Sequence, residues 1–179
     1  MIENFQASLA QILKSEGGYV NDPRDPGNAL PGGRLGSTNL GCTQRVWEAF
    51  VGREVTQDDM RALTPADVAP LYKAQYWDKV KGDQLPAGLD YALFDAAINS
   101  GPGQAGKWLQ QVLDVQADGV IGPGTLAAVA AHSPADLISA YQFKRLAFLK
   151  NLKTWSIYGN GWGRRVTEVA ALATGMATA

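Results

Sequence analysis

The stretch Lys14-Ser15-Glu16-Gly17-Gly18-Tyr19 decides how the first part of this chain folds. The residues before it place apolar side chains at the spacing of one helix face, namely at Phe5, Leu9, Ile12 and Leu13. Gly17-Gly18 is the residue type that ends helices in a left-handed turn. The pattern therefore predicts a helix over residues 5–15 with Glu16 at its carbonyl end.

The predicted place of Glu16 has a chemical consequence. The helix macrodipole is negative at the carbonyl end, so a partly desolvated carboxyl there holds its proton more tightly than a free glutamate. A general acid that works near neutral pH needs this property. Asp25, nine residues later, is a candidate for the second, ionised carboxyl of a glycosidase. The alternative is an ordinary solvated glutamate in the last turn of a helix.

Composition excludes several classes of protein. The 179 residues are 46% hydrophobic and 18% charged, as in an ordinary globular chain. A net charge of -1 gives no strong field toward nucleic acid or anionic lipid, although Arg164-Arg165 forms a local basic pair. One cysteine, Cys42, and one histidine, His132, exclude an intrachain disulfide and the usual four-ligand zinc site. We expect no metal or cofactor.

The ends and the hydropathy of the chain bear on location. The N-terminus has neither a basic segment nor a long apolar segment, so no conventional signal peptide is visible. No apolar run reaches the roughly 18 residues that span a bilayer. We expect synthesis in the cytoplasm, no stable membrane insertion, no nucleic-acid partner and a monomeric state.

Most of the chain reads as helices. Thr64-Pro65-Ala66-Asp67 has the form of a helix start, and Ser133-Pro134-Ala135-Asp136 repeats it, predicting helices over 64–80 and 133–152. Thr43 and Thr56 are placed to cap two further helices. Other helices are expected over 86–100, 104–113, 123–131 and 161–173. Residues 19–40, rich in Pro, Gly and Asn, form a long irregular segment, which in a compact helical protein is usually functional.

These residues match a known family. The N-terminal motif resembles the glycoside hydrolase 108 family of lysozyme-like N-acetylmuramidases, many of them phage or prophage endolysins; it comprises Glu16-Gly17-Gly18-Tyr19-Val20-Asn21-Asp22-Pro23, Asp25-Pro26-Gly27 and Thr38-Asn39-Leu40-Gly41-Cys42-Thr43. The second half resembles the family's peptidoglycan-binding region through Phe94-Asp95, Asn99-Ser100-Gly101, Gln110, Asp118-Gly119-Val120-Ile121-Gly122-Pro123, Thr125, Tyr158-Gly159-Asn160-Gly161-Trp162 and Arg165.

The resemblance implies roles for three residues. Glu16 is then the general acid that protonates the glycosidic oxygen, and Asp25 stabilises the oxocarbenium-like transition state or positions water. Thr38 best matches the threonine that orients the attacking water, with Thr43 as the second choice because it also fits a helix cap. Two departures from the family pattern stand out: residues 28–36 are longer than the expected Gly-rich turn, and Cys42 replaces what is more often isoleucine, which we interpret as packing.

Other constellations carry weaker signals. Asp114 to Gly119 superficially resembles a calcium loop but lacks the glutamate at position twelve, so a turn is the preferred interpretation. Cys42 and His132 could form a thiol peptidase pair, with nothing local to link them. Most aromatic residues should be core, but Tyr19 and Trp162, the latter in a Gly-rich turn, are candidates for sugar binding. Asn99 is a candidate for binding an N-acetyl group, or else a helix C-cap.

The sequence thus predicts a mainly α, lysozyme-like α+β fold: a helical bundle with a small irregular or β lobe near residues 19–42. We expect a catalytic region over 1–84 and a peptidoglycan-binding-like region over 85–179, packed into one unit. The predicted reaction is hydrolysis of the β-1,4 bond between N-acetylmuramic acid and N-acetylglucosamine. Open alternatives are a non-catalytic peptidoglycan-binding or secretion-associated module and a lytic transglycosylase. An endolysin without an export signal would reach the periplasm and cell wall through a holin or similar pore.

Overall fold

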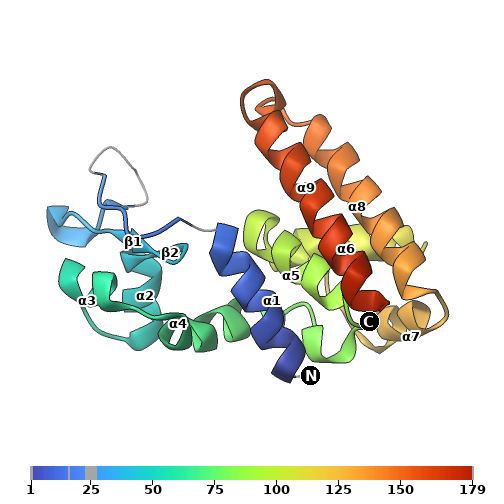
Figure 1. The fold of residues 1–179 in the computed structure, drawn as a ribbon, viewed down its shortest axis with the longest axis horizontal. Helices are drawn as coiled ribbons and strands as arrows, with labels where there is room; N and C mark the ends of the chain where they lie inside the picture. Colours follow the sequence, from blue (N-terminus) through green and yellow to red (C-terminus); the bar gives the residue numbers. More distant parts are fainter. Residues whose placement is uncertain (1, 16, 23–27, 179) are drawn as a thin grey trace. The chain divides into compact units, whose positions relative to one another are not determined.

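The structure, a computed structural model of the chain, describes residues 2–15, 17–22 and 28–178. This part is mainly helical with one two-stranded sheet, which confirms the predicted fold class (Figure 1). Its α-helices and strands are α1 (Ile2–Ser15), β1 (Thr38–Asn39), β2 (Cys42–Thr43), α2 (Gln44–Val51), α3 (Gln57–Ala62), α4 (Pro65–Tyr72), α5 (Leu89–Ser100), α6 (Pro102–Val112), α7 (Pro123–Ala130), α8 (Pro134–Lys150) and α9 (Trp155–Ala177).

The chain divides into two compact units. The smaller unit is Gln6–Ala74, and the larger unit is Gln75–Ala179 together with Met1–Phe5. The first turn of α1 therefore belongs with the larger unit and the remainder with the smaller one. A functional division near residues 84 and 85 stays a prediction.

Helix α1 forms where the apolar spacing predicts it. Phe5, Leu9 and Ile12 are each at most 2% exposed, so the predicted face is the buried one. The helix ends at Ser15, directly before the Glu16-Gly17-Gly18 sequence. Three predicted N-caps in the smaller unit are also confirmed, because the side chains of Thr43, Thr56 and Thr64 accept hydrogen bonds from the first turns of α2, α3 and α4.

Residues 28–36, here named the excursion, close on themselves. Gly36 N donates to Asn28 O at 2.7 Å, and Leu30 N donates to Arg34 O at 3.0 Å. Ala29 and Leu35 form an isolated antiparallel bridge around a 3-10 turn at Pro31–Gly33. The two ends of the excursion thus meet, which leaves Asn28 beside the strand that begins at Thr38.

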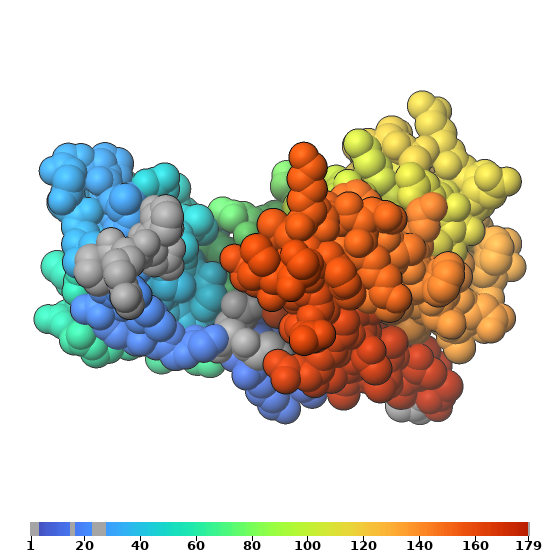
Figure 2. Space-filling model, turned by 90° about the horizontal axis from the view of Figure 1, so that it is seen from above, coloured from blue at the N-terminus to red at the C-terminus, as the bar shows by residue number. Residues whose placement is uncertain are grey.

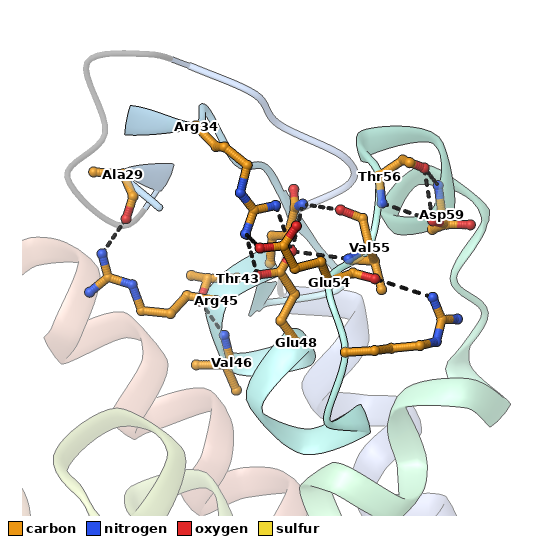
Figure 3. Close-up of polar contacts among 12 residues, drawn as sticks. Ala29, Arg34, Thr43, Arg45, Val46, Glu48, Glu54, Val55, Thr56 and Asp59 are labelled. Atoms are coloured by element: carbon orange, nitrogen blue, oxygen red, sulfur yellow. Dashed lines mark hydrogen bonds and ion pairs between the residues drawn. The ribbon is translucent and has the colours of Figure 1, made fainter. Parts of the chain in front are cut away.

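An ion pair fastens the excursion to α2. The Arg34 guanidinium donates to both carboxylate oxygens of Glu48, at 3.1 and 3.0 Å (Figure 3). Glu48 also accepts from Val55 N at 3.1 Å and from the Gln44 amide at 3.2 Å. These hydrogen bonds, Arg34's the strongest, lower the pKa of Glu48 to about 2. Arg45 adds a hydrogen bond to the carbonyl of Ala29.

The larger unit is built around α5. Every residue from Leu89 to Ala97 is buried, and α5 contacts α6, α8 and α9. Figure 1 shows α8 and α9 running side by side, and in Figure 2 their orange and red surfaces are continuous. Phe5, Trp77 and Phe94 form an aromatic cluster with ring centroids 5.4 to 5.9 Å apart. Asn4 donates to the buried Asp90 at 2.9 Å and fixes the start of α1 to this unit.

Two predicted helix boundaries are wrong. The helix that begins after Thr64 is α-helical only to Tyr72 and continues as a π-helix over Lys73–Trp77, which shifts the side-chain register and buries Trp77 completely. The last helix starts at Trp155 instead of residue 161. One of its glycines is closely packed, because a Cβ on Gly159 would stand 2.5 Å from the Trp155 ring. The predicted Ser133 cap makes no side-chain cap hydrogen bond, although α8 begins there.

The loop between α6 and α7 is held by one buried amide. Gln110 accepts from Gly119 N at 2.7 Å and donates to Asp118 Oδ1 at 2.7 Å. Asp118 Oδ1 also accepts from Val120 N at 2.8 Å, the side-chain-to-backbone contact of an Asx turn, so Asp118 forms the turn that is the preferred interpretation of the sequence. The backbone of this loop lies against α6, so that a Cβ on Gly106 would stand 2.6 Å from Gly119 O.

This contact predicts the cost of a methyl group in α6. Gly106→Ala should lower the free energy of unfolding by about 1 to 3 kcal/mol, because the backbone of residue 119 must move away. Gly103→Ala in the same helix is the matched control, since nothing lies within 4 Å of its added Cβ. It should change stability by less than about 1 kcal/mol. Urea unfolding of both variants measures this, and equal stabilities would contradict the contact.

The Arg34–Glu48 pair predicts a pH-dependent contribution to stability. Because folding lowers the pKa of Glu48 to about 2, the contribution is complete above the ordinary value of 4.5 and is lost as pH falls toward 2. Glu48→Gln should cost about 1 to 2 kcal/mol at pH 7, and the difference from wild type should shrink between pH 5 and about 3. Glu168→Gln, at an exposed carboxyl, is the control and should stay within about 0.5 kcal/mol. A pH-independent deficit in Glu48→Gln would show that the pair acts through packing alone.

Candidate active site

The predicted acid and its partner, Glu16 and Asp25, both lie outside the described residues. The structure therefore describes the candidate site through the groups that follow each of them in the sequence. These are Tyr19, Asn28 and Thr38, all in the smaller unit.

Tyr19 is held against α3 by its hydroxyl and by its ring. Its hydroxyl donates to the Gln57 Oε1 at 3.3 Å, and the Arg61 guanidinium lies 4.5 Å from the ring centroid. Gln57 Nε2 in turn donates to Leu35 O at 2.9 Å, so one amide joins Tyr19 to the excursion. Tyr19 is half-buried. Its predicted sugar-binding role stays a prediction, but its position is fixed.

Thr38 lies between the segment that follows Gly17-Gly18 and strand β2. Its backbone exchanges two hydrogen bonds with Val20, at 2.8 and 2.7 Å. On its other side it is paired with Thr43 in the β1–β2 ladder. The two threonines named from the sequence are thus direct cross-strand neighbours, whose side chains stand on the same face.

The Thr38 hydroxyl has a defined hydrogen-bonding direction. It donates to Asn28 Oδ1 at 3.1 Å, while Asn28 Nδ2 donates to Asp22 O at 3.0 Å and so fixes the amide orientation. Because a hydroxyl has one proton and two lone pairs, the Thr38 oxygen is left as an acceptor. This arrangement suits a group that receives a hydrogen bond from a water molecule.

Asn28 is the residue that sequence reasoning missed. Asn28 is fully buried, at 0% exposure. In the sequence it is one of several asparagines in a Pro- and Gly-rich segment, and nothing there marks it as buried. The burial of Asn28 depends on the hydrogen bond from Gly36 N to Asn28 O, a contact that no local sequence pattern predicts.

The remaining polar candidates near β2 have structural roles. The Thr43 side chain accepts from Val46 N at 3.4 Å as the N-cap of α2, and a substrate-binding role for it stays a prediction. Cys42 is 3% exposed, and burial raises the pKa of its thiol to about 11. It is therefore a packing residue, and a thiol that stays protonated at neutral pH is a poor nucleophile.

In the larger unit, the structure brings together two residues that the sequence named separately. Asn99, at the end of α5, and Trp162, on α9, line one pocket of about 120 Å³. Trp162 lies within a helix and not in the predicted Gly-rich turn. Asn99 Nδ2 donates to Asp95 O at 2.7 Å, one turn back within α5, whereas the C-cap of this helix is Gly101, so Asn99 is not the cap given as its alternative role. Arg165, the second half of the basic pair, also lines the pocket, whereas Arg164 is exposed.

The described residues hold neither a metal-binding cluster nor a membrane-spanning helix. Among them no group of three His, Cys, Asp or Glu side chains is arranged to hold a metal ion. Within the same ranges, no helix combines the length and apolar character needed to cross a membrane.

Comparisons with known proteins identify the family. Residues 9–101 match the sequence profile described as Glycosyl hydrolase 108, and residues 104–167 match the one described as Predicted Peptidoglycan domain. The solved structure of Brucella abortus SagA is 41% identical, with a TM-score of 0.82 over 99% of this chain and 97% of that chain. Curated protein sequences include no significant match. The resemblance seen in the Glu16 and Thr38 motifs is thus confirmed: the chain belongs to the glycosyl hydrolase 108 family and is a glycoside hydrolase with a region that binds peptidoglycan.

Proposed function

We propose that the protein is an N-acetylmuramidase that hydrolyses the β-1,4 bond between N-acetylmuramic acid and N-acetylglucosamine. The observation that carries this proposal is the match of residues 9–101 to the glycosyl hydrolase family, since this range holds the whole Glu16, Asp25 and Thr38 pattern. Two carboxyls, water and substrate suffice for such a reaction.

Glu16 is the proposed general acid. In the sequence it directly follows the last residue of α1, which is the carbonyl end of a 14-residue helix. The partial negative charge of that end favours the protonated carboxyl over the carboxylate. A protonated carboxyl is what the departing glycosidic oxygen requires.

Asp25 and Thr38 are the proposed partners of Glu16. Asp25 would stabilise the positive charge that develops on the sugar or would position the attacking water. The Thr38 hydroxyl donates its proton to Asn28 and so can accept a hydrogen bond from that water. The hydrogen bond to Thr38 orients the water only if the Thr38 hydroxyl keeps a fixed direction. We assign to Asn28 the role of fixing that direction. Tyr19 and Thr43 are proposed to contact the saccharide.

The biological setting is part of the proposal. A muramidase of this family would act in the periplasm and cell wall as a phage or prophage endolysin, released by a holin or similar pore. Cell-wall lysis is then its outcome. Residues 1–84 would supply catalysis and residues 85–179 would hold the peptidoglycan.

The first test is digestion of purified peptidoglycan by the wild type and by Glu16→Gln, with released fragments analysed by mass. The wild type should release fragments with reducing muramic ends, and the variant should be slower by about 10²- to 10⁴-fold because the proton donor is lost. Glu168→Gln, at an exposed carboxyl on α9, is the control and should match the wild type. Anhydro ends would identify a lytic transglycosylase instead. Binding without cleavage would identify a non-catalytic module.

A second test addresses the water-orienting group. Thr38→Val should lower kcat by about 10- to 10²-fold with little change in KM, because a misplaced water reduces the rate without weakening saccharide binding. Thr38→Ser, which keeps the hydroxyl, should restore most of the rate. Asn28→Ala should resemble Thr38→Val in the kcat and KM pattern.

The comparison variant in this second test is Thr43→Val, across the ladder from Thr38. It removes the α2 N-cap, which typically costs about 1 kcal/mol of stability. A larger loss of kcat in Thr43→Val than in Thr38→Val would assign the water-orienting role to Thr43.

A further inference from the structure

The pocket of the larger unit is formed by three helices. Asn99 and Ser100 reach it from the end of α5, Arg145 and Leu149 from α8, and Trp162 and Arg165 from α9. Its volume is about 120 Å³, which has room for several water molecules or for one small polar group such as a carboxylate.

The floor of the pocket carries a buried cation. The Arg145 side chain is only 2% exposed, and its Nη1 lies 2.7 Å from the Oδ2 of the equally buried Asp95. Asp95 is shared, because Arg165 places its Nε 2.9 Å and its Nη2 2.8 Å from the other oxygen, Oδ1. Arg145 thus has part of one carboxylate as its counter-charge.

One donor of this cation is unused. Among the described residues, the Nε of Arg145 has no hydrogen-bond partner, whereas Nη1 forms the 2.7 Å ion pair with Asp95 Oδ2. An unsatisfied buried donor on a charged group carries a large desolvation cost. Asn99 adds a further donor at the rim, because its amide keeps a second N–H after bonding to Asp95 O. The pocket therefore offers positive charge from its two arginines and, at its rim, the Asn99 amide to an entering group, while the Arg145 Nε itself is buried.

An aromatic surface adjoins the pocket on α9. The Trp162 ring lies 5.5 Å from the Tyr158 ring and 6.2 Å from the Trp155 ring. Tyr158 is 54% exposed, so this surface is open to the solvent. Exposed aromatic faces next to an anion site favour a ligand in which a carboxylate stands close to an apolar or sugar face. Peptidoglycan has this combination at each muramic acid and its peptide.

We infer that this pocket binds a carboxylate of peptidoglycan through Arg145, Arg165 and Asn99, with Trp162 contacting the neighbouring part of the ligand. The inference rests on peptidoglycan being the substrate, and it adds the chemical group that the second region recognises. The carboxylate comes from the stem peptide or from the lactyl group of a muramic acid that has lost its peptide.

The test measures binding separately from cleavage. Full-length Glu16→Gln protein is titrated by calorimetry with three probes: a disaccharide carrying a stem tetrapeptide, the same molecule with its carboxylates amidated, and N-acetylmuramic acid without peptide. The free tetrapeptide form should bind about 10- to 100-fold more tightly than the amidated form, as expected for hydrogen bonds to a charged group. A lactyl site would instead show its preference with the peptide-free sugar.

Variants of the pocket arginines test which residues cause the preference for a free carboxylate over an amidated one. Arg145→Met and Arg165→Met should each abolish the preference for the free carboxylate, and each leaves Asp95 one arginine as its partner. Arg164→Met is the matched control, because Arg164 is the neighbouring residue on α9, is 78% exposed and lies 3.9 Å from Glu168. It removes the same charge outside the pocket and should keep the preference. Arg165→Met, at a less buried position than Arg145, keeps the test valid if Arg145→Met fails to fold.

Two results would overturn the inference: an equal affinity of the parent protein for free and amidated probes, or an equal loss in Arg164→Met and the pocket variants. Neither result depends on catalysis, because all the binding proteins carry Glu16→Gln. Failure of the muramidase proposal would appear elsewhere, as wild-type protein that releases no reducing muramic ends.

Discussion

The smaller unit depends on buried side-chain amides that satisfy the backbone of an irregular chain. Its sheet consists of two strands of two residues each, so regular pairing satisfies few of its peptide groups. Three buried amides take over: Asn28 donates to Asp22 O, Asn39 to Met60 O at 2.8 Å and Gln44 to Val55 O at 2.7 Å. Since an unpaired buried peptide group costs about as much as a lost hydrogen bond, these contacts decide the path of the lobe.

The same amides connect the stability of the lobe to its chemistry. Asn28 closes the excursion through its backbone and orients the Thr38 hydroxyl through its side chain. Gln44 holds Val55 and also donates to Glu48, whose other partner is Arg34 of the excursion. A group proposed to orient water is therefore fixed by contacts that also determine whether the lobe folds. This coupling allows a long, Gly-rich segment to present one side chain in a single orientation.

Sequence patterns predicted the parts of the fold that depend on neighbours in the chain. The buried face of α1, the caps at Thr43, Thr56 and Thr64, and the burial of Cys42 all follow from spacing or residue type. The early start of α9 could not be read, because glycine favours a turn, whereas here Gly159 lies in a helix with the Trp155 ring packed against it. Asn28, and the meeting of Asn99 with Trp162, depend on contacts between residues that are farther apart in the chain. The roles of Glu16 and Asp25 remain predictions from the family motif.

The ionic cluster of Asp95, Arg145 and Arg165 joins α5, α8 and α9 at a high desolvation cost. Removing charged groups from water costs several kcal/mol for each ion, and well-packed apolar side chains of similar volume often do the same work at least as well. Asp95 and Arg145 are nevertheless each at most 2% exposed, inside a core that is largely apolar. A purely structural cluster would use its donors internally, whereas Arg145 leaves Nε unused among the described residues and faces a pocket. The cost of burying this charge is more readily offset by a ligand that completes its hydrogen bonds than by the folding of the unit alone.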